Sequence, residues 1–114
     1  MRRISIVSVL TALAVAGGAH AADPGALGLA AHNVLDARPA AEVYWLTHRS
    51  SYSGMTTAKL AAIGGGHGGP LRARVVWATR KNYCLQSTVR GATAHAVSVV
   101  VNKYALYGHC PPRP

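Results

Sequence analysis

Apolar positions recur with a helical period in the first half of the chain and with a two-residue period in the second half. Over residues 27–48 they fall at the three- and four-residue spacing of one helix face. This face comprises Leu27, Ala30, Ala31, Val34, Leu35, Ala41, Tyr44, Trp45 and His48, and Arg38, Glu42 and Arg49 lie away from it. Pro39 lacks a backbone N–H and clashes with the preceding turn, so we expect a kink there, or two helices joined at that point.

A second, shorter helix is predicted over residues 56–63, with Thr56 as a candidate N-cap and Gly64 as its end. Residues 64–70 then contain five glycines, one histidine and one proline. Glycine-rich segments have little side-chain packing and a high ordering entropy. We therefore expect this segment to be a flexible surface loop.

From residue 71 the apolar period changes to two, which is typical of β-strands. Leu71, Ala73, Val75 and Trp77 alternate with Arg72, Arg74, Val76 and Ala78, which predicts a strand with a basic outer face. Further strands are predicted over residues 83–90 and 94–102, separated by turns at 79–82 and 91–93. The prolines among residues 111–114 prevent regular structure at the end of the chain.

Two helices followed by three adjacent strands predict an α+β fold. We expect a long N-terminal helix, kinked near Pro39, and a short helix, both packed on a three-stranded antiparallel sheet. Trp45 and Trp77 are expected to be core residues that join the sheet to the long helix, with a role as ligand platforms as the alternative.

The N-terminus has the three-part order of a secretory leader. Arg2 and Arg3 precede an uncharged apolar run over residues 4–16, and an Ala-x-Ala site predicts cleavage between Ala21 and Ala22. A bilayer span needs about 20 apolar residues, so the run is short for an anchor, although an uncleaved anchor stays an alternative. Residues 1–21 are thus expected to be a signal peptide, and we expect general secretion and not twin-arginine export. Residues 22–114 are expected to form one secreted domain without a membrane span.

The chain carries 12 basic and 3 acidic side chains, a formal net charge of +9. Loss of Arg2 and Arg3 with the leader would lower this value only to +7, so the basic character belongs to the expected mature domain. The two cysteines, Cys84 and Cys110, are expected to form a disulfide in an oxidising compartment, with two free thiols as the alternative.

The sequence offers little for catalysis or for a metal cofactor. A metal site needs three or four converging ligands, and the mature histidines, which are His32, His48, His67, His95 and His109, form no HxH or HxxxH pair. Only three acids remain for acid–base chemistry, Asp23, Asp36 and Glu42, and no Gly-x-Ser-x-Gly elbow is present. We therefore expect a protein that is not an enzyme and has no cofactor.

Five basic residues carry more weight for function than any single histidine. Arg72, Arg74, Arg80, Lys81 and Arg90 fall on the first two predicted strands or beside them. With the nearby aromatic residues Trp77 and Tyr83 they could hold phosphates and stack bases, whereas a merely solvated cationic face is the simpler alternative.

Four short segments carry a family resemblance. They are residues 40–44 (Ala-Ala-Glu-Val-Tyr), residues 51–56 (Ser-Tyr-Ser-Gly-Met-Thr) with Leu60, residues 83–86 (Tyr-Cys-Leu-Gln), and Gly91 with the closing Cys110. In order and spacing, residues 30–110 resemble the globular domain of short actinobacterial type IV pilins and pseudopilins. This resemblance implies filament assembly, but residues 4–16 contain no Glu, and a cleavable leader replaces the N-terminal helix that pilins retain.

Three functional hypotheses follow, of which an enzyme is the third. The first is a secreted, non-enzymatic binding or assembly protein with a pilin-like domain, whose basic sheet face binds an anionic polymer (DNA or cell-wall polymer) or another envelope protein. The alternative is a small secreted inhibitor or effector that presents the loop at residues 64–70 to a protein target.

Overall fold

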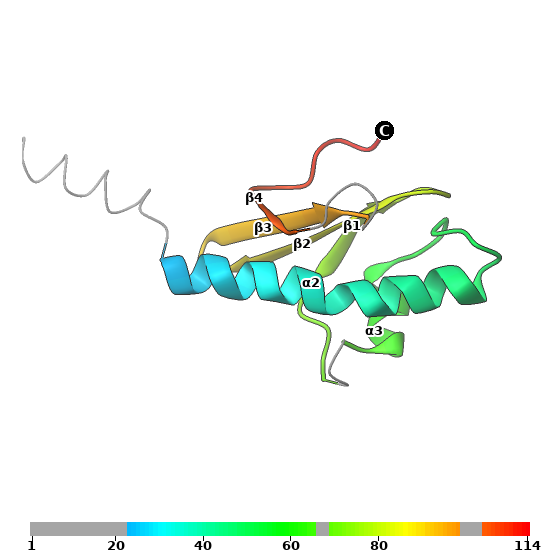
Figure 1. Ribbon diagram of the computed structural model, residues 1–114, viewed down its shortest axis with the longest axis horizontal. Helices are drawn as coiled ribbons and strands as arrows, with labels where there is room; N and C mark the ends of the chain where they lie inside the picture. Colours follow the sequence, from blue (N-terminus) through cyan, green and yellow to red (C-terminus); the bar gives the residue numbers. More distant parts are fainter. Residues whose placement is uncertain (1–22, 66–68, 99–103) are drawn as a thin grey trace, which may run out of the picture.

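The computed structural model describes residues 23–65, 69–98 and 104–114 (Figure 1). The described elements are α2 (Pro24–Thr47), α3 (Thr57–Ile63), β1 (Arg74–Ala78), β2 (Tyr83–Val89), β3 (Ala92–Val97) and β4 (Leu106–Tyr107). The strands form one antiparallel sheet in the order β1-β2-β3-β4. The α+β prediction with one long and one short helix is confirmed. The expected signal peptide, part of the glycine-rich loop and the end of the third predicted strand lie outside the described residues.

Helix α2 is continuous through Pro39, so the alternative of two helices joined at this proline is wrong. Asp23 is the N-cap and accepts a hydrogen bond from the Gly25 amide, and Pro24 occupies the first turn. Packing against β2 and β3 on one side of the helix outweighs the backbone hydrogen bond that Pro39 cannot donate. The expected kink stays a prediction.

The buried face of α2 is rotated from the predicted one. Leu35 is 37% exposed, whereas Arg38 is buried and its Nη2 donates to the Val97 carbonyl at 3.2 Å. Small side chains dominate the buried face, as at Ala37, Ala40 and Ala41, which allows the helix to lie close to the sheet. Since apolar residues surround the whole helix, the sequence pattern could not determine which face packs on the sheet.

The hydrophobic core lies between α2, α3 and the near face of the sheet. The members of this cluster are Val34, Ala37, Ala40, Ala41, Tyr44, Tyr52, Met55, Leu60, Ala73, Tyr83, Leu85 and Ala96. Trp45 is partly buried against it, which agrees with the expectation for this tryptophan. The predicted N-cap of α3 is confirmed, since the Thr56 hydroxyl accepts a hydrogen bond from the Lys59 amide at 3.2 Å.

An irregularity in β1 places Trp77 on the opposite face of the sheet. Val75 pairs with Leu85 but Trp77 pairs with Cys84, so Val76 is an extra residue in the strand. A one-residue shift moves the following side chains to the other face. Trp77 is buried as expected, but it does not join the sheet to α2; its Nε1 donates to the Pro111 carbonyl of the C-terminal tail at 2.8 Å.

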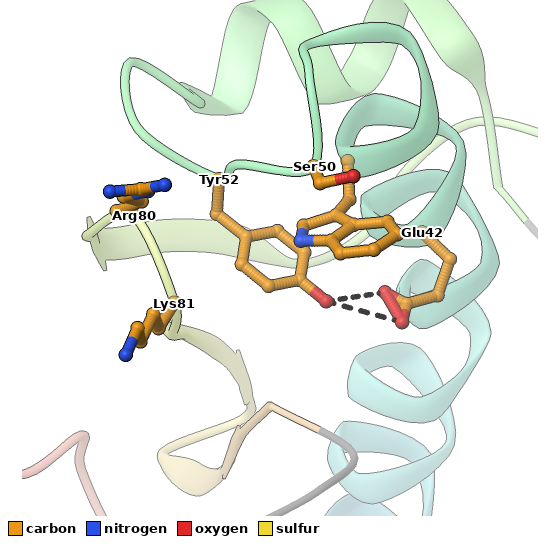
Figure 2. Close-up of a pocket in the computed structure, with 6 residues that line it drawn as sticks. Glu42, Ser50, Tyr52, Arg80 and Lys81 are labelled. Atoms are coloured by element: carbon orange, nitrogen blue, oxygen red, sulfur yellow. Dashed lines mark hydrogen bonds between the residues drawn. The ribbon is translucent and has the colours of Figure 1, made fainter.

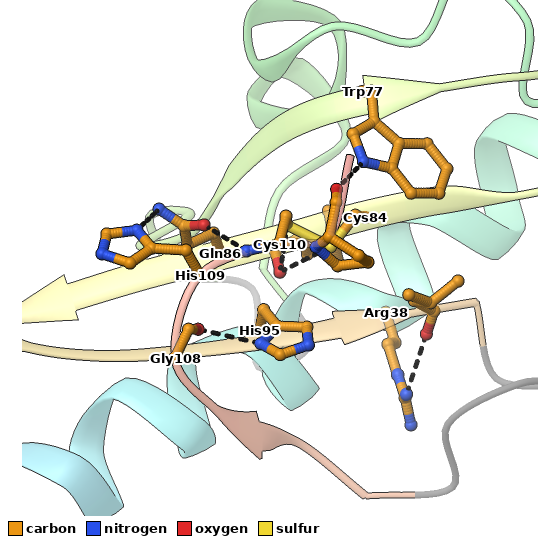
Figure 3. The surroundings of a disulfide bond; sticks show 11 residues. Arg38, Trp77, Cys84, Gln86, His95, Gly108, His109 and Cys110 are labelled. Carbon is orange, nitrogen blue, oxygen red and sulfur yellow. Dashed lines mark hydrogen bonds between the residues drawn. A yellow bond between two sulfur atoms is a disulfide. The ribbon is translucent and has the colours of Figure 1, made fainter. Parts of the chain in front are cut away.

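The C-terminal tail crosses the sheet face that lies away from α2 (Figures 1 and 3). The predicted disulfide between Cys84 and Cys110 is confirmed, with a Cα–Cα distance of 6.1 Å. Gln86 Oε1 accepts a hydrogen bond from the Cys110 amide at 2.7 Å, and His95 Nδ1 lies 2.8 Å from the Gly108 carbonyl. The tail thus covers the centre of the sheet.

The tail also contributes the fourth strand, which corrects the three-stranded prediction. In β4, Leu106 pairs with His95 and Tyr107 pairs with Ala94. Two residues are too few to give a periodic pattern, so the sequence did not reveal this strand.

Among the helices that the structure describes, none combines the length and the apolar character that a bilayer span requires.

Candidate functional site

The five basic residues of the sequence hypothesis occupy four different places. Arg72 precedes β1 and lines a pocket beside α2, together with His32 and Asp36. Arg74 pairs with Gln86, whose side chain contacts the C-terminal tail, so Arg74 lies on the far face of the sheet. Arg80 and Lys81 belong to the β1–β2 turn, and Arg90 to the β2–β3 turn.

Arg90 is separated from the Arg80–Lys81 pair by the whole length of β2. Seven residues of extended strand span about 20 Å. The Arg90 guanidinium instead lies 3.1 Å from the Asp23 carboxylate at the start of α2. Among the five, Arg80 and Lys81 are the two that line the same pocket.

A pocket of about 460 Å³ lies beside Arg80 and Lys81 (Figure 2). We call it the cationic cleft, and its lining residues are Glu42, Trp45, Ser50, Tyr52, Arg80 and Lys81. The second half of α2, the loop after this helix and the β1–β2 turn each contribute to it. Arg80, Lys81 and Ser50 are exposed, and Trp45 is partly exposed.

Backbone hydrogen bonds fix the two loops that form the cleft. The Ser50 amide donates to the Trp45 carbonyl at 3.0 Å, and the Tyr52 amide donates to the Arg80 carbonyl at 3.0 Å. Arg49 and Ser50 both have a φ of 58°, a left-handed conformation that is uncommon for residues other than glycine. Such strained residues persist only where the surrounding contacts determine them, so the cleft is preformed.

Tyr52 and Glu42 form the polar centre of the cleft. The Tyr52 hydroxyl lies 2.7 Å from Glu42 Oε2 and 3.2 Å from Oε1. Its ring packs edge-on against Tyr83 at 4.7 Å and lies 6.4 Å from Trp45. Burial, followed by the hydrogen bond to Glu42, raises the pKa of Tyr52. Tyr52 therefore stays protonated and holds the Glu42 carboxylate in one orientation.

The side chains of the cleft divide it into two sides. In Figure 2 the Tyr52 ring lies between Arg80 and Lys81 on one side and Glu42 on the other. The first side can attract an anionic group, and the second offers carboxylate oxygens to hydrogen-bond donors. Trp45, which is partly exposed, also lines the cleft and provides a surface for a flat ring.

Histidines and acids in the described parts of the chain do not gather into a metal site. Among residues 23–65, 69–98 and 104–114, no three side chains of His, Cys, Asp or Glu come together. His48 stacks on Tyr44 with a centroid distance of 3.7 Å, and His109 Nδ1 lies 3.3 Å from Gln86 Nε2. These two histidines have structural contacts, and His67 lies outside the described residues.

Sequence reasoning missed Glu42, Trp45 and Tyr52 as members of the site. Glu42 and Trp45 are three residues apart on α2 and therefore neighbours on its surface, which is a signal that the sequence contained. Nothing in the sequence indicated that the β1–β2 turn would lie beside them.

No protein-family model, curated protein sequence or solved structure matches the chain.

Proposed function

We propose that the chain is an exported, non-enzymatic binding protein with a pilin-like domain that holds an anionic polymer at the cationic cleft. The observation that supports this function best is the position of two adjacent exposed cations, Arg80 and Lys81, beside partly exposed aromatic surface in a preformed pocket. The proposal narrows the basic face expected from the sequence to one end of the sheet.

Charge and shape both favour a polyanion over a small neutral ligand. The formal net charge, which is +9 for the whole chain and +7 without Arg2 and Arg3, attracts anionic polymers before contact, and cations that neutralise the polymer release its counterions. The cleft is open and exposed on its cationic side. An internal segment of a long polymer can therefore bind there, without a polymer end having to be threaded into the cleft. Binding should therefore weaken steeply as the salt concentration rises.

Substitution of the two cations tests this function. We expect the double variant Arg80→Gln/Lys81→Gln to bind polyanions about tenfold more weakly than the unmodified protein at low salt, with a shallower dependence on salt. The probes are fluorescently labelled oligothymidylate of about 12 nucleotides and polygalacturonate, a polyanion without bases. Binding is measured by fluorescence anisotropy for the first and by titration calorimetry for the second.

The matched control is the double variant Arg74→Gln/Arg113→Gln. It removes the same charge from two exposed residues that lie outside the cleft. Equal weakening by both double variants would show a general charge effect and contradict the proposal. Absence of binding to both polymers would contradict it as well.

A further inference from the structure

Glu42 is an anionic group inside a cleft that otherwise attracts anions. Its carboxylate would repel a phosphate or carboxylate of the ligand, so the part of the ligand beside it must instead carry hydrogen-bond donors. The ligand thus needs two chemically different ends, an anionic one at Arg80 and Lys81 and a donor-bearing one at Glu42. The two ends must be connected past Tyr52, which lies between them in Figure 2, and Trp45 lines the same cleft.

The hydrogen bond from Tyr52 leaves Glu42 able to accept two more donors side by side. The single hydroxyl proton of Tyr52 lies near both carboxylate oxygens, at O–O distances of 2.7 Å and 3.2 Å. An ionised carboxylate offers about four lone-pair sites, so each oxygen retains capacity for a further donor. The structure therefore presents a fixed pair of acceptors in a cleft that the partly exposed Trp45 also lines.

A nucleotide has the required arrangement, with a phosphate at one end and a flat base at the other. Bases of single strands stack on aromatic side chains and form hydrogen bonds through their Watson–Crick edges. Only guanine carries two adjacent donors on that edge, N1–H and the 2-amino group. Adenine and cytosine place an acceptor beside their amino group, and thymine has one N–H between two carbonyls.

We infer that the cationic cleft binds single-stranded nucleic acid and prefers guanine, whose N1–H and 2-amino groups donate to Glu42 while its base stacks on Trp45 and its phosphate lies at Arg80 and Lys81. This inference rests on the proposed function and names the ligand of the same site. Glu42 is the residue that determines base specificity, and Tyr52 positions it.

Three oligonucleotides of equal length and charge test the inference on the unmodified protein. One contains only thymine, the second alternates thymine with guanine, and the third alternates thymine with inosine, which differs from guanosine only by the missing 2-amino group. We expect the guanine oligomer to bind about tenfold more tightly than the thymine oligomer, the order expected for a bidentate base contact. The inosine oligomer should lose most of this advantage. Equal affinity for all three oligomers would overturn the inference.

The variant Glu42→Gln tests the role of the carboxylate. Its amide can still accept the Tyr52 hydroxyl proton, but it offers one acceptor and one donor in place of two acceptors. We expect the preference for guanine to disappear, while affinity for the thymine oligomer stays the same or rises because a negative charge has been removed. A variant that only disturbed the fold would weaken both complexes.

The matched control is Asp36→Asn, which removes an acidic charge from the same helix outside the cleft and should retain the preference for guanine. Retention of that preference by Glu42→Gln would overturn the inference. Binding of polygalacturonate through Arg80 and Lys81, without binding of the oligonucleotides, would also overturn it and leave the proposed function intact. If Glu42→Gln fails to fold, the comparison of guanine with inosine still decides the outcome.

Discussion

At the scale of single residues, the Tyr52 hydroxyl connects the loop after α2 to the helix itself. Its bond to Glu42 spans ten residues of sequence and involves a tyrosine that is only 6% exposed. A hydrogen bond to a charged acceptor contributes more than one between neutral groups. Tyr52 is therefore expected to stabilise the fold in addition to its role in the cleft.

We predict that Tyr52→Phe lowers the free energy of unfolding by about 1–2 kcal/mol, because it removes one hydrogen bond to a carboxylate without changing the ring. Guanidinium denaturation followed by tryptophan fluorescence measures this loss. Tyr107→Phe is the matched control, since Tyr107 is 69% exposed and should change nothing. An unchanged stability of Tyr52→Phe would contradict the prediction.

The carboxylate of Asp23 predicts a dependence of stability on pH. The Gly25 amide and the Arg90 guanidinium donate hydrogen bonds to it and lower the pKa of Asp23 from its usual 3.8. The folded state then binds the proton less tightly than the unfolded state. The stabilisation is present above pH 3.8 and is lost as the pH falls through the lower pKa of the folded state.

The variant Asp23→Asn tests this dependence, because asparagine retains the capping acceptor but not the charge. We expect a small decrease in melting temperature at neutral pH, since both side chains of the ion pair are more than half exposed. The difference between variant and unmodified protein should shrink below pH 3.8. A difference in melting temperature that grows as the pH falls would contradict the assignment of this pH dependence to Asp23.

At the scale of elements, α3 depends on its cap. The helix has only seven residues, and Leu60 is the buried one among them. Helices of this length are not stable without packing and capping. The Thr56 side chain satisfies one of the free amides at the start of α3.

We predict that Thr56→Ala lowers the free energy of unfolding by about 1 kcal/mol, the usual contribution of a threonine N-cap. Thr56→Ser retains the capping oxygen and should be nearly neutral. Thermal denaturation by circular dichroism compares the two variants with the unmodified protein. Equal losses in both variants would indicate that the methyl group, and not the cap, is responsible.

The order and type of elements could be predicted because segments rich in glycine or polar residues separate them and because the spacing of apolar residues changes between the two halves of the chain. The helical spacing before residue 49 and the alternation after residue 70 both correspond to real elements. The face that each element presents was less predictable. For α2 an apolar surface all round hid the true packing face, and for β1 the extra residue Val76 reversed the side on which Trp77 lies. Both outcomes depend on tertiary packing, which local patterns do not encode.

At the scale of the whole molecule, the candidate site could be predicted only in part. The basic charge of the chain predicted a polyanionic ligand, and Arg80 and Lys81 were among the predicted binding residues. The cleft itself depends on the hydrogen bond between the Tyr52 amide and the Arg80 carbonyl, which joins segments 28 residues apart in sequence. No property of either segment alone indicates that contact.

The disulfide is the main covalent constraint on the fold. It joins residues 26 apart, and the chain-entropy model gives a stabilisation of about 3.5 kcal/mol for a loop of that length. We predict that Cys84→Ala/Cys110→Ala loses about this amount in chemical denaturation. Reduction of the unmodified protein should lower the free energy of unfolding by a similar amount. The double variant should lose slightly more, because it also leaves a small cavity at the fully buried Cys84. A loss of less than about 1 kcal/mol would contradict this role.

The attachment of the tail to β2 also determines how the domain would respond to mechanical force. Tension applied to the chain beyond Cys110 passes through the disulfide directly to Cys84 in the second strand of the sheet. The polypeptide between the two cysteines, which includes β3 and β4, then carries no load. In a single-molecule pulling experiment the oxidised protein should release a contour length shorter by this segment, and a reducing agent should restore the missing length. The protein can therefore be stretched while β3 and β4 remain enclosed in an unextended loop.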